Sequence, residues 1–166
     1  MKTIGILLLV FLLGMQTTFA QKLSTKERKE QKAAEIKQLI EKGDFVFTAR
    51  FANPMSGPKI DLTSVYDLKF KGDSVEAWLP YYGRAFQVPY ADHDGGIKFK
   101  AKVDRIETTF NEKKKSYQLN FEVKDQRDTY KMNLFVGLSG YGNLNVNMNH
   151  RQSISFSGIV EALKEE

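Results

Sequence analysis

The side chains best suited to ligand contact gather in one stretch, which reads Trp78-Leu79-Pro80-Tyr81-Tyr82-Gly83-Arg84 and continues to Pro89-Tyr90. Tryptophan, tyrosine and arginine suit stacking on a sugar, a ring or a peptide. Proline keeps such a stretch out of the middle of a sheet. The candidate ligand-binding residues are therefore Trp78, Tyr81, Tyr82, Arg84 and Tyr90. The alternative is a structural bend, in which the rings cover the core and Arg84 pairs with an aspartate.

A second set of polar side chains alternates along one segment. Asn143, Asn145, Asn147 and Asn149 fall on one face of an expected strand. A row of amides could hold a polyol or a glycan by hydrogen bonds. The wet face of an exposed strand explains the same row, and we favour that interpretation from the sequence.

Residues suited to catalysis or metal binding are sparse. The two histidines, His93 and His150, lie in different segments, and neither has a second histidine at metal-ligand spacing. The loop around His93 resembles part of a calcium site but lacks the later glutamate. Asp61 and Asp67 share the polar face of one strand, where carboxylates are common. Neither a nucleophile elbow nor a zincin or phosphate-loop pattern occurs. We expect no catalytic residues, no metal and no cofactor, and we lean against an enzyme.

The first 20 residues have the layout of a secretory signal. Met1-Lys2 supplies a positive charge, an apolar run follows from Ile4 to Leu13, and small residues precede a cleavage site after Ala20. An N-terminal membrane anchor is the alternative, but the run is short for a span. The chain has no cysteine, which excludes disulfides and a lipid-modified cysteine. No later segment is apolar enough to cross a membrane as a helix. The net charge of +5 could attract nucleic acid, but export makes nucleic acid an unexpected partner.

The elements that must position these side chains begin with one helix. Residues 21–43 form a charged N-terminal segment in which Ser24 and Glu27 fit a capping box and Gly43 fits a C-cap. The apolar stripe at Ala33, Ile36, Leu39 and Ile40 is short, so we expect only the second half of the helix to pack firmly.

The period of the apolar residues changes to two after Gly43, which predicts strands through residues 44–166. Alternation recurs in eight segments, at 45–51, 60–70, 75–79, 97–103, 117–123, 130–138, 144–148 and 154–156. A bulge or break is expected near Asp104-Arg105, and a short final helix could begin near Ile159. One helix cannot cover eight half-apolar strands, so the sheet must cover itself. We predict a mainly β protein with one N-terminal helix, in which an antiparallel meander of about eight strands forms a strongly curved sheet or barrel.

Several strings together resemble one family. They are Asn53-Pro54-Met55-x-Gly57, Tyr66-Asp67-Leu68, Lys71-Gly72-Asp73-Ser74, Leu79-Pro80-Tyr81-x-Gly83-Arg84-Ala85, Gly95-Gly96-Ile97-Lys98-Phe99 and Arg151-Gln152-Ser153-Ile154-Ser155-Phe156-x-Gly158. These strings, over roughly residues 35–160, resemble an uncharacterised domain-of-unknown-function family of exported proteins from Bacteroidetes-type bacteria. Asn149 precedes the last string, and His150 stands where the family pattern has a second asparagine before Arg151. The resemblance implies the periplasm or outer surface of a Gram-negative bacterium, and it implies no activity.

The function expected from these observations is that of a non-enzymatic binding or envelope-associated module. Its ligand would be a small apolar molecule, enclosed by the barrel, or a glycan. A structural module that docks on an envelope protein through its helix or an edge strand is the first alternative. An envelope hydrolase is the second, and it requires carboxylates or histidines that converge in one pocket.

Overall fold

The computed structural model describes residues 24–86, 95–125 and 128–163. The expected signal peptide, Tyr90 and His93 lie outside these residues. Helix α2 (Thr25–Lys42) begins at the predicted cap, where the Ser24 backbone N–H donates to Glu27 Oε2 over 2.7 Å. It ends at Gly43, whose φ of 73° is the left-handed value that glycine adopts at low cost. Within the described part of the chain, no helix is long and apolar enough to cross a bilayer.

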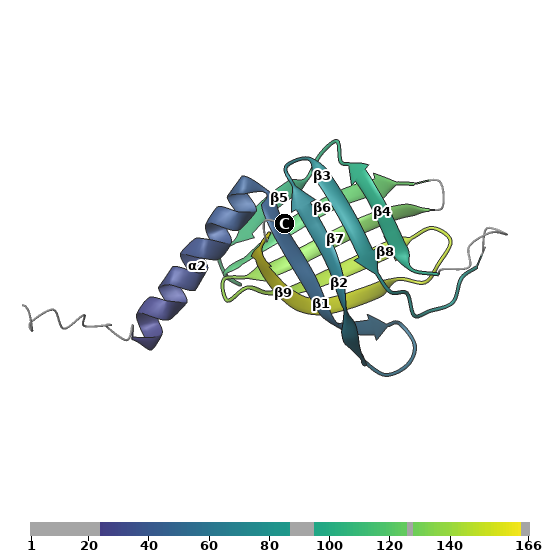
Figure 1. Ribbon diagram of the computed structural model, residues 1–166, viewed down its shortest axis with the longest axis horizontal. Helices are drawn as coiled ribbons and strands as arrows, with labels where there is room; N and C mark the ends of the chain where they lie inside the picture. The colour runs from purple at the N-terminus through teal and green to yellow at the C-terminus, as the bar shows by residue number, and fades with distance from the viewer. Residues whose placement is uncertain (1–23, 87–94, 126–127, 164–166) are drawn as a thin grey trace, which may run out of the picture.

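Over the residues described, the β domain is one antiparallel sheet of nine strands (Figure 1). In chain order they are β1 (Asp44–Pro54), β2 (Ile60–Lys71), β3 (Ser74–Leu79), β4 (Ile97–Lys102), β5 (Glu107–Asn111), β6 (Ser116–Lys124), β7 (Thr129–Gly137), β8 (Tyr141–Met148) and β9 (Ile154–Ala162). The spatial order is β4-β3-β2-β1-β9-β8-β7-β6-β5, so the first and last strands of the chain pair in the middle. Strands β4 and β5 are the two edges.

The sheet curls so that its two halves face one another, with β1 to β4 in front of β5 to β8 in Figure 1. Aromatic rings meet across the interior. The Phe70 ring of β2 lies edge-on to Phe121 of β6, with centroids 5.4 Å apart, and Phe99 of β4 lies 5.2 Å from Tyr130 of β7. Phe45 stacks on Phe70 at 4.4 Å. These rings fill the interior where they meet, and their burial away from water drives the curling.

A bulge at Arg50 lets the sheet bend. The pairing of β1 with both neighbours shifts between Ala49 and Phe51. Opposite the bulge, Gly158 brings β9 so close that an added Cβ would lie 2.0 Å from the Thr48 carbonyl oxygen. Only glycine permits this approach.

The fold class predicted from the sequence is confirmed, with two differences in detail. The described part of the chain has nine strands, and the additional one is β5, whose five residues are all exposed and so give no alternation of burial. The break expected near Asp104-Arg105 is the connection by which the chain leaves edge strand β4 and starts the opposite edge. The short helix suggested near Ile159 is wrong, because that residue lies within β9, paired with β1 and β8.

Helix α2 packs against β1 and β9 at one end of the curled sheet (Figure 1). Ile36 and Ile40 are buried there, whereas the residues of its first two turns are exposed. Firm packing of only the second half is therefore confirmed. The helix closes this end of the core, and among the described residues no helix lies on the outer face of β6 to β9.

Candidate functional site

The outer face of β6 to β9 carries many uncharged polar side chains, interrupted by Phe135 between Gln118 and Asn143 and by Glu122 and Lys131 beside Asn147. Because successive strand residues point to opposite faces, burial of Leu144, Val146, Ile154 and Phe156 turns their neighbours outward. We call this surface the amide face; it consists of Gln118, Asn120, Asn133, Asn143, Asn145, Asn147, Ser153, Ser155, Ser157 and, from β1, Asn53.

The strand register aligns the amide face in rows across the sheet. In one row, Asn120 pairs with Asn133, Asn133 with Asn145, and Asn145 with Ser155, which in turn pairs with Asn53. This row crosses five neighbouring strands. Strands lie about 4.8 Å apart, so each step brings another amide or hydroxyl within reach of a molecule lying across them.

Hydrogen bonds within the amide face hold several of these groups in place. The Ser157 hydroxyl accepts from the amides of Asn53 at 3.2 Å and Asn143 at 3.3 Å. The Ser153 hydroxyl donates to Asn147 Oδ1 at 2.7 Å. Such bonds reduce the conformational entropy that binding would otherwise cost. The face is therefore partly preorganised.

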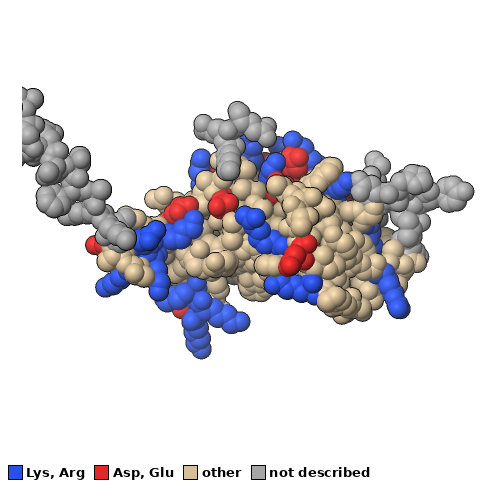
Figure 2. All heavy atoms as spheres, turned by 60° about the horizontal axis from the view of Figure 1, so that its bottom comes forward, with Lys and Arg blue, Asp and Glu red and all other residues tan. Residues whose placement is uncertain are grey.

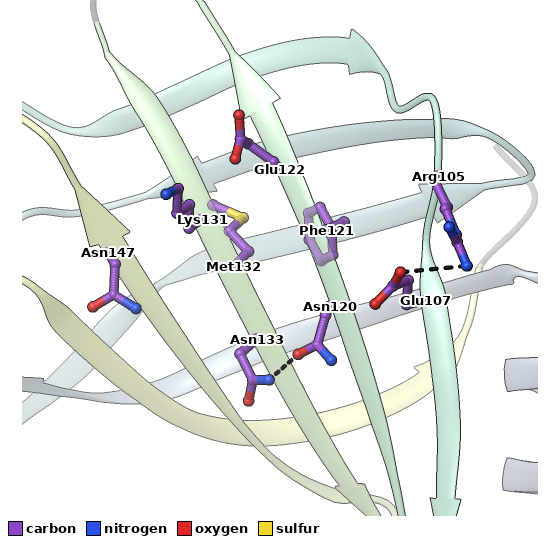
Figure 3. A pocket seen from close by; sticks show the side chains of 9 residues that line it. All are labelled: Arg105, Glu107, Asn120, Phe121, Glu122, Lys131, Met132, Asn133 and Asn147. Atoms are coloured by element: carbon purple, nitrogen blue, oxygen red, sulfur yellow. Dashed lines mark hydrogen bonds and ion pairs between the residues drawn. The ribbon is translucent and has the colours of Figure 1, made fainter.

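An open hollow of about 380 Å³ lies at the β5–β7 end of the amide face (Figure 3). Asn120 and Asn133 line it, and the Asn133 amide donates to Asn120 Oδ1. Longer charged side chains stand around them, among them Arg105 and Glu107, which form an ion pair at 3.4 Å. Asn133 Oδ1 is buried and accepts no hydrogen bond from the residues that the structure describes.

The aromatic stretch predicted to bind a ligand is divided by the fold. Trp78 points outward from β3 and is 52% exposed, with the Lys98 ammonium 3.9 Å from its ring centroid. Tyr81 and Tyr82 instead pack against the core, and Arg84 is exposed. Tyr90 lies outside the described residues.

Tyr81 and Arg84 take part in a junction that ties the segment after β3 to the segment before β9. The Tyr81 hydroxyl donates toward the carbonyl oxygens of Arg84 and Gln152, each 3.0 Å away. Gln152 also donates its N–H to the Arg84 carbonyl at 3.0 Å and accepts from the Arg84 N–H at 3.2 Å. Burial raises the pKa of Tyr81 above its ordinary value near 10, and the nearby Arg151 charge opposes that rise. A Cβ added at Gly83 would lie 2.6 Å from the Tyr81 hydroxyl, so a larger residue there would displace the Tyr81 side chain.

Two buried charged residues complete this junction. Asp128 is 4% exposed, and its carboxylate accepts the backbone N–H groups of Thr129 at 2.8 Å, Asn149 at 2.9 Å and His150 at 3.3 Å. Arg151 is 6% exposed and donates to the Gly95 carbonyl at 2.8 Å. Both carboxylate oxygens of Asp128 thus accept from backbone donors. These two residues fix chain segments in place, which is a structural role.

Groups suited to catalysis do not converge in the described part of the chain. Its histidines and carboxylates form no cluster of three that could hold a metal ion. Asp67 forms an ion pair with Lys69, whose Nζ lies 3.6 Å from the carboxylate, and Asp61 is exposed. His150 takes part in the junction through its backbone, whose N–H donates to Asp128. Lysine and arginine side chains are spread over the face seen in Figure 2, with acidic residues among them.

Comparison with known proteins places the chain among its relatives. The family model described as "Domain of unknown function (DUF4251)" matches residues 27–160. The chain belongs to the DUF4251 family. A crystal structure of a DUF4251 family protein from Bacteroides eggerthii DSM 20697 superposes with a TM-score of 0.61 at 14% sequence identity. The match covers 80% of this chain and 88% of that one, and at this identity it shows a shared fold. No curated protein matches the chain.

The structure explains why two of the strings that resembled DUF4251 proteins occur together. The string from Leu79 to Ala85 and the string that starts at Arg151 are 66 residues apart in the chain, yet they form the junction described above. Ala85 and Arg151 form an antiparallel bridge there. The residues of these strings are therefore explained by the DUF4251 fold itself.

Sequence reasoning found part of the amide face and missed the rest. The alternation of asparagines on β8 was visible, but its continuation through Asn120, Asn133 and Ser155 depends on which strands pair and in what register. Nor was there a local signal for Asp128 or Arg151, since burial of a charged residue follows from tertiary packing. The alternating polar residues of segment 117–123, Asn120 among them, were the one sequence signal that pointed to the rest of the amide face.

Proposed function

We propose that the protein is an exported, non-enzymatic binding module whose amide face holds a neutral, polyhydroxylated ligand such as a glycan chain. The observation that carries the proposal is the row of amides and hydroxyls that crosses five strands in register. Each asparagine amide offers both donors and acceptors, as does each serine hydroxyl. This combination matches the hydroxyl groups of a sugar and gives little attraction to a purely ionic ligand.

The geometry of the face supports an extended ligand rather than an enclosed one. Aromatic rings meet inside the curled sheet, which disfavours a small apolar ligand there. Outside, a chain lying across the strands would meet a new polar side chain about every 4.8 Å, a spacing comparable to one hexose unit. The hollow lined by Asn120 and Asn133 would seat one sugar.

Export is part of the proposal. The arrangement of charge, apolar run and small residues in the first 20 residues supports cleavage and a periplasmic or outer-surface location. Mass spectrometry of the protein recovered from the envelope fraction is expected to show Gln21 as the first residue. An intact N-terminus in that fraction would refute cleavage.

Titration calorimetry with neutral oligosaccharides tests the ligand class. Cello-, malto- and chito-oligosaccharides serve as probes for residues 21–166. We expect weak binding, with a dissociation constant in the range of about 10 μM to 1 mM, for at least one of the three. Longer oligosaccharides of that series should bind more tightly than shorter ones.

A matched pair of variants locates the site. Asn145→Leu removes an amide from the middle of the row and should weaken binding at least tenfold, roughly 1.4 kcal/mol. Gln38→Leu removes an exposed amide from α2 and should leave binding unchanged. Equal effects of the two substitutions, or no binding of any probe, would count against the amide face.

A further inference from the structure

Strand β5 ends the sheet with an uncovered edge. It pairs with β6 on one side, and no residue that the structure describes pairs with its other side. All five of its residues, Glu107–Asn111, are exposed. An edge strand presents unpaired backbone N–H and C=O groups, which readily accept another strand.

The opposite edge, β4, is protected in a way that β5 is not. Three lysines alternate along β4, and each is held by a residue of β3 or of the turn just before it. Lys98 lies over the Trp78 ring. Lys100 pairs with Glu76 at 3.1 Å and Lys102 with Asp73 at 3.3 Å. Lysines placed like this repel an approaching copy of the same edge.

Strand β5 carries one charged residue among five. Glu107 is paired with Arg105, and Thr108, Thr109, Phe110 and Asn111 are neutral. Threonine and phenylalanine favour strand structure. The Phe110 ring lies 4.7 Å from Tyr117 but is still 38% exposed. A strand added to this edge would therefore find compatible backbone groups and apolar surface to cover.

We propose that the free edge of β5 pairs antiparallel with the same edge of a second copy of this chain, with Thr109 opposite the partner's Thr109. This register places Glu107 opposite the partner's Asn111 and Thr108 opposite the partner's Phe110. No like charges face each other within the paired strands. Threonine pairs and pairs of an aromatic with a β-branched residue are favourable across strands.

Symmetry favours a second copy joined β5 to β5 over a head-to-tail contact between β4 and β5. The symmetric contact uses both free β5 edges and stops at two chains, whereas head-to-tail pairing leaves an edge free for further growth. Five residues bury less than the roughly 800 Å² per partner typical of a stable interface. The dimer is therefore weak and forms at high concentration.

Sedimentation velocity of residues 21–166 from about 1 μM to about 1 mM measures the association. We expect the weight-average sedimentation coefficient to rise from the monomer toward the dimer value. Thr109→Lys places like charges opposite each other and should weaken dimerisation at least tenfold. Thr63→Lys makes the same change at an exposed position of β2 and should leave it unchanged.

Hydrogen–deuterium exchange then identifies the edge. Amides of β5 should exchange more slowly as the concentration of the wild-type chain rises, and those of β4 should not change. A monomer over the whole range would overturn the proposal. So would a dimer without concentration-dependent protection of β5, or equal weakening by the two lysine variants. Circular dichroism of both variants confirms that the sheet is intact. These results do not depend on glycan binding.

Discussion

Asp128 allows a quantitative test of the junction between the segment before β7 and the one before β9. Its buried carboxylate accepts three backbone N–H groups, from Thr129, Asn149 and His150. A hydrogen bond to a charged group contributes about 1.5–3 kcal/mol, and a buried donor left without a partner costs about 1–3 kcal/mol. Since the three bonds share one carboxylate and are not additive, Asp128→Ala should lower the free energy of unfolding by about 4 kcal/mol.

Asp128→Asn should have an intermediate effect. An asparagine oxygen in the place of Oδ1 keeps the bonds from Thr129 and Asn149, while its NH₂ group faces the donor of His150. One bond is lost and two become weaker, so the expected cost is about 2 kcal/mol. The order of stability is therefore wild type, asparagine, alanine.

Guanidinium unfolding at neutral pH, followed by circular dichroism, measures both differences as the shift in midpoint multiplied by the common slope. Asp104→Ala, at an exposed position, is the control and should stay within about 0.5 kcal/mol of wild type. A cost below about 1 kcal/mol for Asp128→Ala would show that water replaces the carboxylate. If the asparagine variant is as unstable as the alanine variant, the negative charge of Asp128, and not the placement of its acceptor oxygens, stabilises the junction.

Three further predictions concern single side chains. Gly158→Ala should cost about 3 kcal/mol or more, because the new Cβ meets the Thr48 carbonyl oxygen, whereas Ser157→Ala should cost less than half as much; similar thermal shifts for the two would contradict the close approach. Burial raises the pKa of Tyr81 in the folded chain. The contribution of its protonated hydroxyl to the free energy of unfolding is therefore complete below about pH 10 and is lost as the pH rises through the folded-state pKa. Urea midpoints between pH 7 and 11 should thus fall less steeply above pH 10 for Tyr81→Phe than for wild type; parallel curves would argue against this assignment. Asn133→Val should change the free energy of unfolding by less than about 1 kcal/mol, because it removes a buried acceptor without a partner and also the hydrogen bond donated to Asn120 Oδ1, and it should weaken any oligosaccharide binding; a variant destabilised by more than about 2 kcal/mol would mean that the amide serves the fold.

The amphipathic pattern made most of the fold predictable. Alternation from Phe45 onward required a sheet that covers itself, and the caps at Ser24 and Gly43 defined the helix, because both signals depend on residues close in sequence. Strand β5 escaped prediction for the same reason. At an edge, with all five residues exposed, it needs no apolar alternation.

The candidate site was less predictable than the fold. The aromatic stretch drew attention through its composition, yet Tyr81 is occupied in the junction and Trp78 lies against Lys98. Side-chain type alone cannot tell a ligand contact from an internal one, because stacking and hydrogen bonding are the same in both. Binding by Trp78, Tyr81, Tyr82, Arg84 or Tyr90 stays a prediction.

The sequence by itself determined the local conformations: which segments extend, where the helix begins and ends, and which side of each strand avoids water. Those properties follow from neighbours a few residues apart. Only the tertiary structure decided that β1 pairs with β9 and that Asn120, Asn133, Asn145 and Ser155 share one row. It also decided which charges, such as Asp128, are buried. Register between strands far apart in the chain is chosen by how the apolar faces pack around the curled core, and that choice belongs to the whole sheet rather than to any single segment.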